Sequence, residues 1–328
     1  MRTKSMKKLS LFFCGLLIFL MAGCGGAGKN KTAKQNQPLI LATGPANGTY
    51  LGAGTLLSQL WNSGNLGFTV DTLETSGSVA NIELIQQKRA DLGIVQGDVA
   101  YEANAGRGTF RTRKMENLQQ LGVLCWEPVQ IVTPQRSGIK TLAELKDKII
   151  AVGAAGSGSE VTARHILMTA GLTFTDVKVQ YLSLNDAVTA LRNGTVDAAF
   201  LAETAPLPML KELAAQLPLV FLGIPDEQLA TLTKENPQYR RGKILAGTYP
   251  GLALDVPTAE IPCVLVATDA LPKERAAALL TKLLENPAAI HRTLPQFPLL
   301  TKAVLRGAET VPWAPGAEQS YQNNQSGS

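Results

Sequence analysis

The sequence has few of the residues on which enzymes most often rely. It contains only two histidines, His165 and His291, and aromatic residues make up 5% of its 328 positions. Neither histidine lies beside a serine or cysteine in a nucleophile motif such as GxSxG. Carboxylate clusters typical of a cation site are also missing. We therefore expect no catalytic activity, no cofactor and no metal, with His165 partly buried in a helix and His291 at the surface.

Long apolar segments and nucleotide-binding loops are missing as well. No internal apolar run approaches the roughly 18 to 20 residues that span a bilayer, which argues against a multi-pass membrane protein. Residues 153–159 are rich in glycine, but Ser157-Gly158-Ser159 stands where a P-loop needs Gly-Lys-Ser/Thr. No GxGxxG motif occurs in the loops either, so nucleotide binding is not indicated.

The first 24 residues have the pattern of a lipoprotein signal peptide. Basic residues within positions 1–8 precede an apolar run over residues 9–21, which meets Ala22-Gly23-Cys24. The small residues admit a signal peptidase, and the Cys24 thiol is the group that takes the lipid. The alternative interpretation is an uncleaved anchor or a buried helix, for which the apolar run is short. We expect a leader at 1–23 and an extracytoplasmic chain anchored to the membrane through Cys24.

The basic character of the chain comes mostly from this leader. The formal net charge is +5, and four basic residues but no acidic residue precede Cys24. The rest of the chain is therefore near +1, so the charge gives no sign of nucleic-acid binding.

Four cysteines give no metal-binding or redox motif. Cys14 leaves with the leader and Cys24 is acylated, so Cys125 and Cys263 remain. Their spacing has no CxxC character, and neither a zinc site nor a thioredoxin-type motif is indicated.

Residues 24–37 are polar and without periodicity, which is typical of a flexible tether. Beyond them, short β-rich apolar runs alternate with longer helical patterns, which predicts an α/β chain with open parallel sheets. Strands are expected at 38–43, 68–73, 91–95, 149–152, 177–181 and 197–201, and helices at 50–63, 79–89, 160–170 and 184–193.

The alternation of strands and helices occurs in two similar segments of the sequence, which predicts two lobes. Residues 82–92 and 188–198 form the clearest internal repeat. In each segment a predicted helix ends and an Asp stands at the start of a buried strand. Two extended apolar stretches, 123–132 and 261–267, are expected to cross between the lobes as a two-strand hinge. Lobe 1 is then 38–127 with 262–328, and lobe 2 is 128–261. The hinge would bring Cys125 near Cys263, without a disulfide being expected.

Polar clusters with small residues follow four of the predicted strands, at 43–50, 75–78, 96–98 and 153–160. In open α/β sheets this carboxyl edge is where ligands bind. Glycine lets a ligand approach the backbone, and unpaired amides at a helix start favour an anion. Helix capping alone explains any single cluster, but four clusters on one edge favour a ligand site.

Several motifs, taken in order, resemble one family of solute receptors. They are Gly48-Thr49-Tyr50, Ser76-Gly77-Ser78 with Asn81, residues 90–96, 156–159 and 193–200, Tyr249-Pro250-Gly251, and residues 312–317. In these motifs the chain resembles the TRAP-associated extracytoplasmic immunogenic (TAXI) proteins over nearly all of residues 38–322. These are the receptors of tripartite ATP-independent periplasmic (TRAP) transporters. Ala314 and Glu203-Thr204 depart from the family pattern, which leaves the exact ligand open.

The resemblance implies a type II periplasmic-binding-protein fold, two lobes that close on a ligand, and delivery to a TRAP-type membrane permease. The expected ligand is a small carboxylate-bearing metabolite, such as a glutamate-like amino acid or a dicarboxylate. A ligand-sensing ectodomain of a signalling system is the alternative. The candidate ligand contacts are Thr43, Gly44, Thr49, Tyr50, Ser76, Gly77, Ser78, Gln96, Asp98, Gly156, Ser157, Gly158, Ser159, Glu203 and Thr204.

Within this set we expect the ligand carboxylate at the helix that begins near Ser159, held by the Ser157 and Ser159 hydroxyls and by nearby amides. Arg164 lies one turn further along this helix and is expected at the surface. Asp98 and Glu203 are the candidates for an ammonium group, if the ligand carries one.

Overall fold

The computed structural model describes residues 37–46 and 48–322. The predicted leader, Cys24 and most of the predicted tether lie outside the described residues. Within the described part, no helix combines the length and the apolar character needed to cross a membrane.

Lobe 1 begins with a parallel three-stranded sheet whose strands alternate with helices. Its elements are β1 (Leu39–Ala42), α1 (Thr49–Ser63), β2 (Val70–Leu73), α2 (Ser78–Gln86), β3 (Leu92–Gln96), α3 (Gly97–Ala105) and the short 3-10 helix η1 (Gly108–Phe110). The strands lie in the order β2-β1-β3. The helix predicted at 79–89 ends earlier, at Gln86, because Lys88 adopts a φ of 58° and the Arg89 amide turns back to the Leu84 carbonyl.

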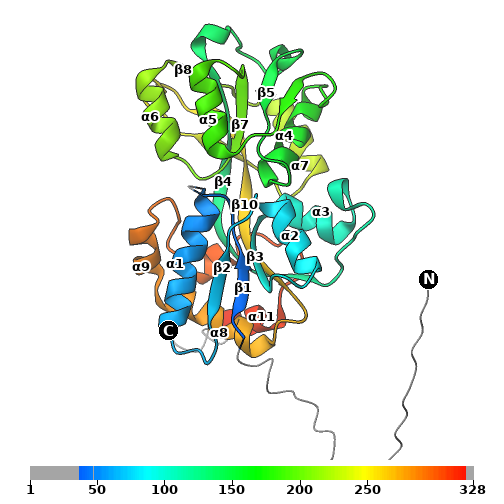
Figure 1. The fold of residues 1–328 in the computed structure, drawn as a ribbon, viewed down its shortest axis with the longest axis vertical. Coiled ribbons are helices and arrows are strands. Elements are labelled where there is room, and N and C mark those ends of the chain that lie inside the picture. The colour runs from blue at the N-terminus through cyan, green and yellow to red at the C-terminus, as the bar shows by residue number, and fades with distance from the viewer. Residues whose placement is uncertain (1–36, 47, 323–328) are drawn as a thin grey trace, which may run out of the picture. The chain divides into compact units, whose positions relative to one another are not determined.

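Lobe 2 repeats this arrangement (Figure 1). Its elements are η2 (Gln135–Ser137), η3 (Ala143–Leu145), β5 (Ile149–Ala151), α4 (Gly158–Thr169), β6 (Lys178–Gln180), α5 (Leu184–Asn193), β7 (Ala198–Ala202), α6 (Pro208–Gln216), β8 (Leu219–Phe221), α7 (Asp226–Glu235) and β9 (Arg240–Ile244). The order β6-β5-β7 is parallel, as β2-β1-β3 is in lobe 1. Each lobe therefore turns the carboxyl ends of three parallel strands toward one edge.

The internal sequence repeat corresponds to the same hydrogen bond in both lobes. Asp91, just before β3, accepts a hydrogen bond at 2.8 Å from the amide of Ile40 in β1. Asp197, just before β7, accepts one at 2.8 Å from the amide of Ile149 in β5. In both lobes a carboxylate ties the third strand to the first, so the repeat of Asp before a buried strand is confirmed as a structural repeat.

Two long antiparallel strands connect the lobes, as the sequence predicts (Figure 1). They are β4 (Leu118–Pro134) and β10 (Val256–Thr268), both longer than the stretches expected. Strand β4 pairs with β10 as far as Pro128 and with β7 from Val129 to Val132. Cys125 and Cys263 lie opposite one another in this ladder, and both thiols are free, as expected. The lobe boundaries themselves stay a prediction.

After β10 the chain returns to lobe 1 through α8 (Lys273–Glu285), α9 (Pro287–Thr293), α10 (Lys302–Leu305) and α11 (Pro315–Gln322). The buried side chain of Trp61 in α1 packs here, and its Nε1 donates to the Leu279 carbonyl at 3.0 Å. His291 in α9 is exposed, as predicted.

Candidate ligand-binding site

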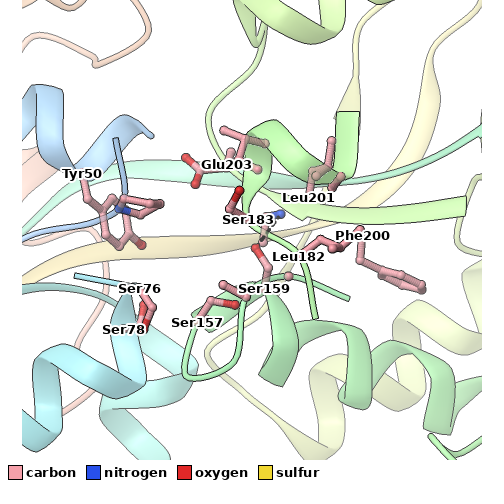
Figure 2. A pocket seen from close by; sticks show the side chains of 18 of the residues that line it. Tyr50, Ser76, Ser78, Ser157, Ser159, Leu182, Ser183, Phe200, Leu201 and Glu203 are labelled. Carbon is pink, nitrogen blue, oxygen red and sulfur yellow. Dashed lines mark hydrogen bonds between the residues drawn. The ribbon is translucent and has the colours of Figure 1, made fainter. Parts of the chain in front are cut away.

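A pocket lies where loops at the carboxyl ends of strands from both lobes meet (Figure 2). Its empty space is about 570 Å³ with its open mouth included, of which about 50 Å³ admits the centre of a water-sized group. A space of this size suits a small molecule rather than a peptide. The lining consists of Pro45, Tyr50, residues 76–78, Gln96, Gly153, Ala154, residues 157–159 and 182–184, Ala187 and residues 200–203.

Nine of the fifteen predicted contacts line this pocket. They are Tyr50, Ser76, Gly77, Ser78, Gln96, Ser157, Gly158, Ser159 and Glu203. The structure thus brings residues from α1, α2, β3, α4 and the end of β7 together in one place.

Three helices begin at the pocket wall. Gly77 precedes α2, Ser157 precedes α4 and Ser183 precedes α5, and all three residues line the pocket. A helix start carries unpaired N–H groups and a partial positive charge, which attract an anion. The pocket therefore offers anion-binding backbone groups from both lobes.

The serine hydroxyls at these helix starts are oriented by the backbone. Ser157 accepts from the Glu160 amide at 3.2 Å, and Ser159 accepts from the Ala202 amide at 3.2 Å. The capping explanation is thus correct for Ser157. However, a hydroxyl that accepts from an amide still has its own hydrogen to donate. Within the described residues neither hydroxyl has an acceptor, so each is a positioned donor beside the pocket.

Positive side chains are not part of the lining. Among the described residues that line the pocket, none is a lysine, arginine or histidine. Arg164 pairs instead with Glu160 at 2.7 Å and lies over the Phe174 ring, as a surface residue would. Any anion in this pocket would be held by amides and hydroxyls.

Among the described residues of the lining, Glu203 is the one with a carboxyl group. Glu203 follows β7, and its Oε2 accepts from the Thr49 amide at 3.3 Å. Burial raises the pKa of Glu203 above its ordinary value. Burial acts in this direction because it disfavours the charged form of the carboxyl group.

Comparison with known proteins agrees with this architecture. A model of the NMT1-like family matches residues 41–324. The chain belongs to the NMT1-like family.

Solved structures of low sequence identity share the fold of this NMT1-like chain. MatC from Rhodopseudomonas palustris, solved with bound malate, is 14% identical with a TM-score of 0.57, covering 88% of this chain and 97% of its own. PhnD1 from Prochlorococcus marinus, solved with methylphosphonate, is 13% identical with a TM-score of 0.56, covering 83% and 95%. The chain therefore has the mixed α/β periplasmic-binding-protein fold that the resemblance implied.

Glu127 is a buried carboxyl group in β4 of the NMT1-like chain that sequence reasoning did not single out. Its Oε2 accepts from the Tyr50 hydroxyl at 3.0 Å and from Gln96 Nε2 at 3.4 Å. Burial raises its pKa well above the ordinary value, with the nearby Cys263 and Glu203 adding to the shift. Glu127 does not line the pocket itself, but it positions the side chains of Tyr50 and Gln96, which do. A lone Glu inside an apolar run, as in Cys125-Trp126-Glu127-Pro128, was the available signal.

Five of the other six predicted contacts surround the pocket without lining it. The Thr43 hydroxyl donates to the Leu73 carbonyl at 2.8 Å, and Gly44 packs against Tyr50. The Thr49 and Thr204 hydroxyls are 3.0 Å apart and join lobe 1 to lobe 2. The fifth residue, Gly156, accepts from the Ala80 amide at 3.1 Å, which also joins the lobes.

Asp98, the sixth, belongs to a separate group of side chains, which we call the interlobe cluster: Asp98 and Glu102 on α3, His165 on α4, and Tyr239. The Tyr239 hydroxyl donates to Asp98 Oδ2 at 2.5 Å and lies 3.0 Å from His165 Nδ1. His165 Nε2 is 3.0 Å from Glu102 Oε1. Asp98 therefore has partners within the protein and does not face the pocket.

The hydrogen-bond directions in the interlobe cluster make His165 a cation. Tyr239 gives its single hydrogen to Asp98, so His165 Nδ1 must donate to the Tyr239 oxygen. Nε2 meets a carboxylate and must donate as well. Burial lowers the pKa of His165, but Asp98 and Glu102 outweigh burial and raise it to about 9. The expectation that His165 is partly buried holds, but the residue joins the two lobes.

Ser183 and the apolar residues of the pocket were also missed by sequence reasoning. Ser183 caps α5 and lines the pocket together with Leu182, Phe200 and Leu201. The available signal for Ser183 was its place between the predicted strand 177–181 and the predicted helix 184–193, which makes a fifth strand-to-helix turn with a polar residue. The apolar residues gave no signal, because strand cores and pocket walls use the same residue types.

Proposed function

We propose that this chain is an extracytoplasmic solute-binding lipoprotein of the TAXI type, which captures a small carboxylate-bearing metabolite and delivers it to a TRAP-type permease. The observation that carries the proposal is the pocket itself. Three helix starts and oriented serine hydroxyls surround a small space, and none of the described residues in its lining has a cationic side chain. Such a site binds an anion without holding it by an ion pair, which suits a receptor that must later release its solute.

The ligand carboxylate lies against the start of α4 in this proposal. Ser157 and Ser159 donate to it through the hydrogens that their backbone contacts leave free. Glu203 then faces the opposite part of the ligand and accepts a hydrogen bond from a hydroxyl or ammonium group. Leu182 and Leu201 contact its carbon chain. A glutamate-like amino acid and a dicarboxylate both fit this description.

A double change at the proposed carboxylate site is the direct test. We expect Ser157→Ala with Ser159→Ala to weaken binding by about tenfold to several hundredfold, because the hydrogen bonds that both hydroxyls donate to the carboxylate are lost. The solute is first identified by native mass spectrometry of freshly purified protein, with glutamate and malate as the starting panel. Calorimetry then compares variant and parent.

The control must separate binding from capping. Thr301→Ala removes the side-chain cap of α10, since the Thr301 hydroxyl accepts from the Val304 amide. It lies away from the pocket and should leave affinity unchanged. Parent-like affinity in a folded double variant would show that the carboxylate is held elsewhere.

The lipid anchor is tested independently of the pocket. We expect Cys24→Ser to move the protein from the membrane to the soluble fraction, because the thiol that takes the lipid is gone. Solute affinity should stay at the parent value, which calorimetry on the soluble variant measures. Retention on membranes after salt and carbonate washing would contradict the lipoprotein assignment.

A further inference from the structure

A second group of side chains lies behind the pocket, on the paired strands β4 and β10. Cys125 and Glu127 come from β4, and Cys263 comes from β10. One sulfur or oxygen atom of each residue lies within 4.8 Å of the corresponding atoms of the other two, and all three side chains are buried. We call this group the thiol–carboxylate cluster.

The carboxyl group of Glu127 is held at one oxygen and free at the other. Oε2 accepts from Tyr50 and from Gln96, at 3.0 and 3.4 Å. Oε1 is buried and has no hydrogen-bond partner among the described residues. A buried polar atom without a partner is costly and needs an explanation. Carboxylates that bind metals are typically oriented by such outer hydrogen bonds, with the remaining oxygen directed at the ion.

We propose that Cys125, Glu127 and Cys263 bind a divalent thiophilic cation of the Zn²⁺ class. Thiolate sulfur with one carboxylate oxygen is a donor set that suits Zn²⁺ rather than Mg²⁺ or Ca²⁺. Tetrahedral zinc with Zn–S of about 2.3 Å needs sulfur atoms about 3.8 Å apart, so the two sulfur atoms, which lie within 4.8 Å of one another, must draw together by at most about 1 Å. Binding releases the thiol protons, and three protein donors leave one coordination position open.

The proposal departs from the absence of a metal expected from sequence. Cys125 and Cys263 are far apart in the chain and become neighbours only through the register of β4 and β10. The cluster also contacts the solute pocket, because Tyr50 and Gln96 line that pocket and donate to Glu127. A bound ion would fix Glu127 and thereby those two side chains. This coupling rests on the proposed function, whereas ion binding does not.

The test uses the full chain with Cys14→Ser and Cys24→Ser as its background, which leaves Cys125 and Cys263 as the remaining thiols among four cysteines. Reduced, metal-free protein is titrated with Zn²⁺ and counted by native mass spectrometry. Cd²⁺ is the spectroscopic probe, since thiolate ligation produces a sulfur-to-metal charge-transfer absorption. We expect one ion per chain, with binding weakened at least tenfold in Cys125→Ala and in Cys263→Ala, and weakened in Glu127→Gln.

His165→Gln is the matched control, because it removes the imidazole that sits between Asp98 and Glu102. It should keep the bound ion. No Zn²⁺ on the folded background protein would overturn the proposal, as would retention in the Cys125→Ala, Cys263→Ala double variant. A Cys125–Cys263 disulfide in freshly isolated protein would also overturn it. Where the cysteine variants do not fold, absence of the Cd²⁺ charge-transfer band from the background protein is decisive against it.

Discussion

Gly158→Ala is expected to weaken solute binding by about tenfold to more than a hundredfold while leaving the ligand-free protein as stable as the parent. A Cβ at Gly158 would lie 1.7 Å from Gln96 Oε1 and 2.8 Å from Ser78 Oγ. Both atoms belong to lobe 1, whereas Gly158 begins α4 of lobe 2. In the proposed function the lobes separate when the ligand leaves, so we expect the clash only in the ligand-bound state. Overpacking of this kind costs about 1 to 3 kcal/mol.

Neither neighbour of Gly158 can move freely to relieve this clash. Gln96 is buried and donates to Glu127, and the Ser78 hydroxyl accepts from the Gln96 amide at 3.0 Å. Alanine is also a better helix former than glycine, so the separate lobe 2 should not be destabilised. Calorimetry gives the affinity, and thermal unfolding without solute gives the stability.

Gly52→Ala is the matched control for this change. Gly52 lies within α1, and an added Cβ there meets nothing within 4 Å. It should bind solute like the parent. Parent-like binding by Gly158→Ala as well would show that the ligand-bound state does not include the contact between Gly158 and Gln96.

Solute affinity is expected to fall by about ten- to a hundredfold as the pH rises from 6.5 to about 9. In the joined lobes Asp98 and Glu102 raise the pKa of His165 from 6.5 to about 9, despite burial, which lowers it. When the lobes separate, His165 leaves both carboxylates and regains an ordinary pKa. Closure therefore takes up one proton between these two values.

The direction of this pH dependence follows from the pKa of His165, which is higher when the lobes are joined. The contribution of His165 to closure is complete below pH 6.5 and is lost as the pH rises through about 9. The groups that face His165 are Asp98 and Glu102 from α3, together with Tyr239. Burial holds the pKa of Tyr239 well above its ordinary value, so this phenol does not titrate in the same range.

His165→Gln should remove the dependence on pH, because glutamine cannot gain a proton. His291→Gln is the control, since His291 is the other of the two histidines and is exposed on α9. It should keep the parent profile. Binding titrations from pH 6 to 9.5 decide the matter, and a flat profile for the parent would contradict the role of His165 in closure.

Much of the fold follows from local sequence patterns. Helix 184–193 has the bounds predicted for it, and the other predicted helices and strands of both lobes differ by a few residues. The serines at the starts of α2 and α4 were found because small polar residues after a buried strand have a local cause, namely capping and the turn into a helix. Eight pocket residues could be predicted on that basis, and the ninth, Glu203, was singled out because the chain departs there from the family pattern.

The contacts between the two lobes could not be predicted in the same way. His165 lies in an ordinary helical pattern, and nothing near it in sequence shows that Glu102 is its partner. The position of Asp98 after a strand predicts a ligand contact, but in the structure its Oδ2 accepts a hydrogen bond from the Tyr239 hydroxyl. Periodicity indicates whether a side chain is buried but does not indicate which residue of another element lies against it.

Local sequence patterns were enough to predict ten strands and helices between residues 38 and 201, the two-lobed repeat with Asp91 and Asp197 before equivalent strands, and the polar residues at the strand ends. These features depend on neighbours a few residues away. Three other contacts are visible only in the folded chain. Cys125 and Glu127 lie next to Cys263, Gly158 packs against Gln96, and His165 lies within hydrogen-bond distance of Glu102. Each of these contacts depends on the register of β4 with β10 or on the meeting of two lobes, and both are set by packing across the whole chain.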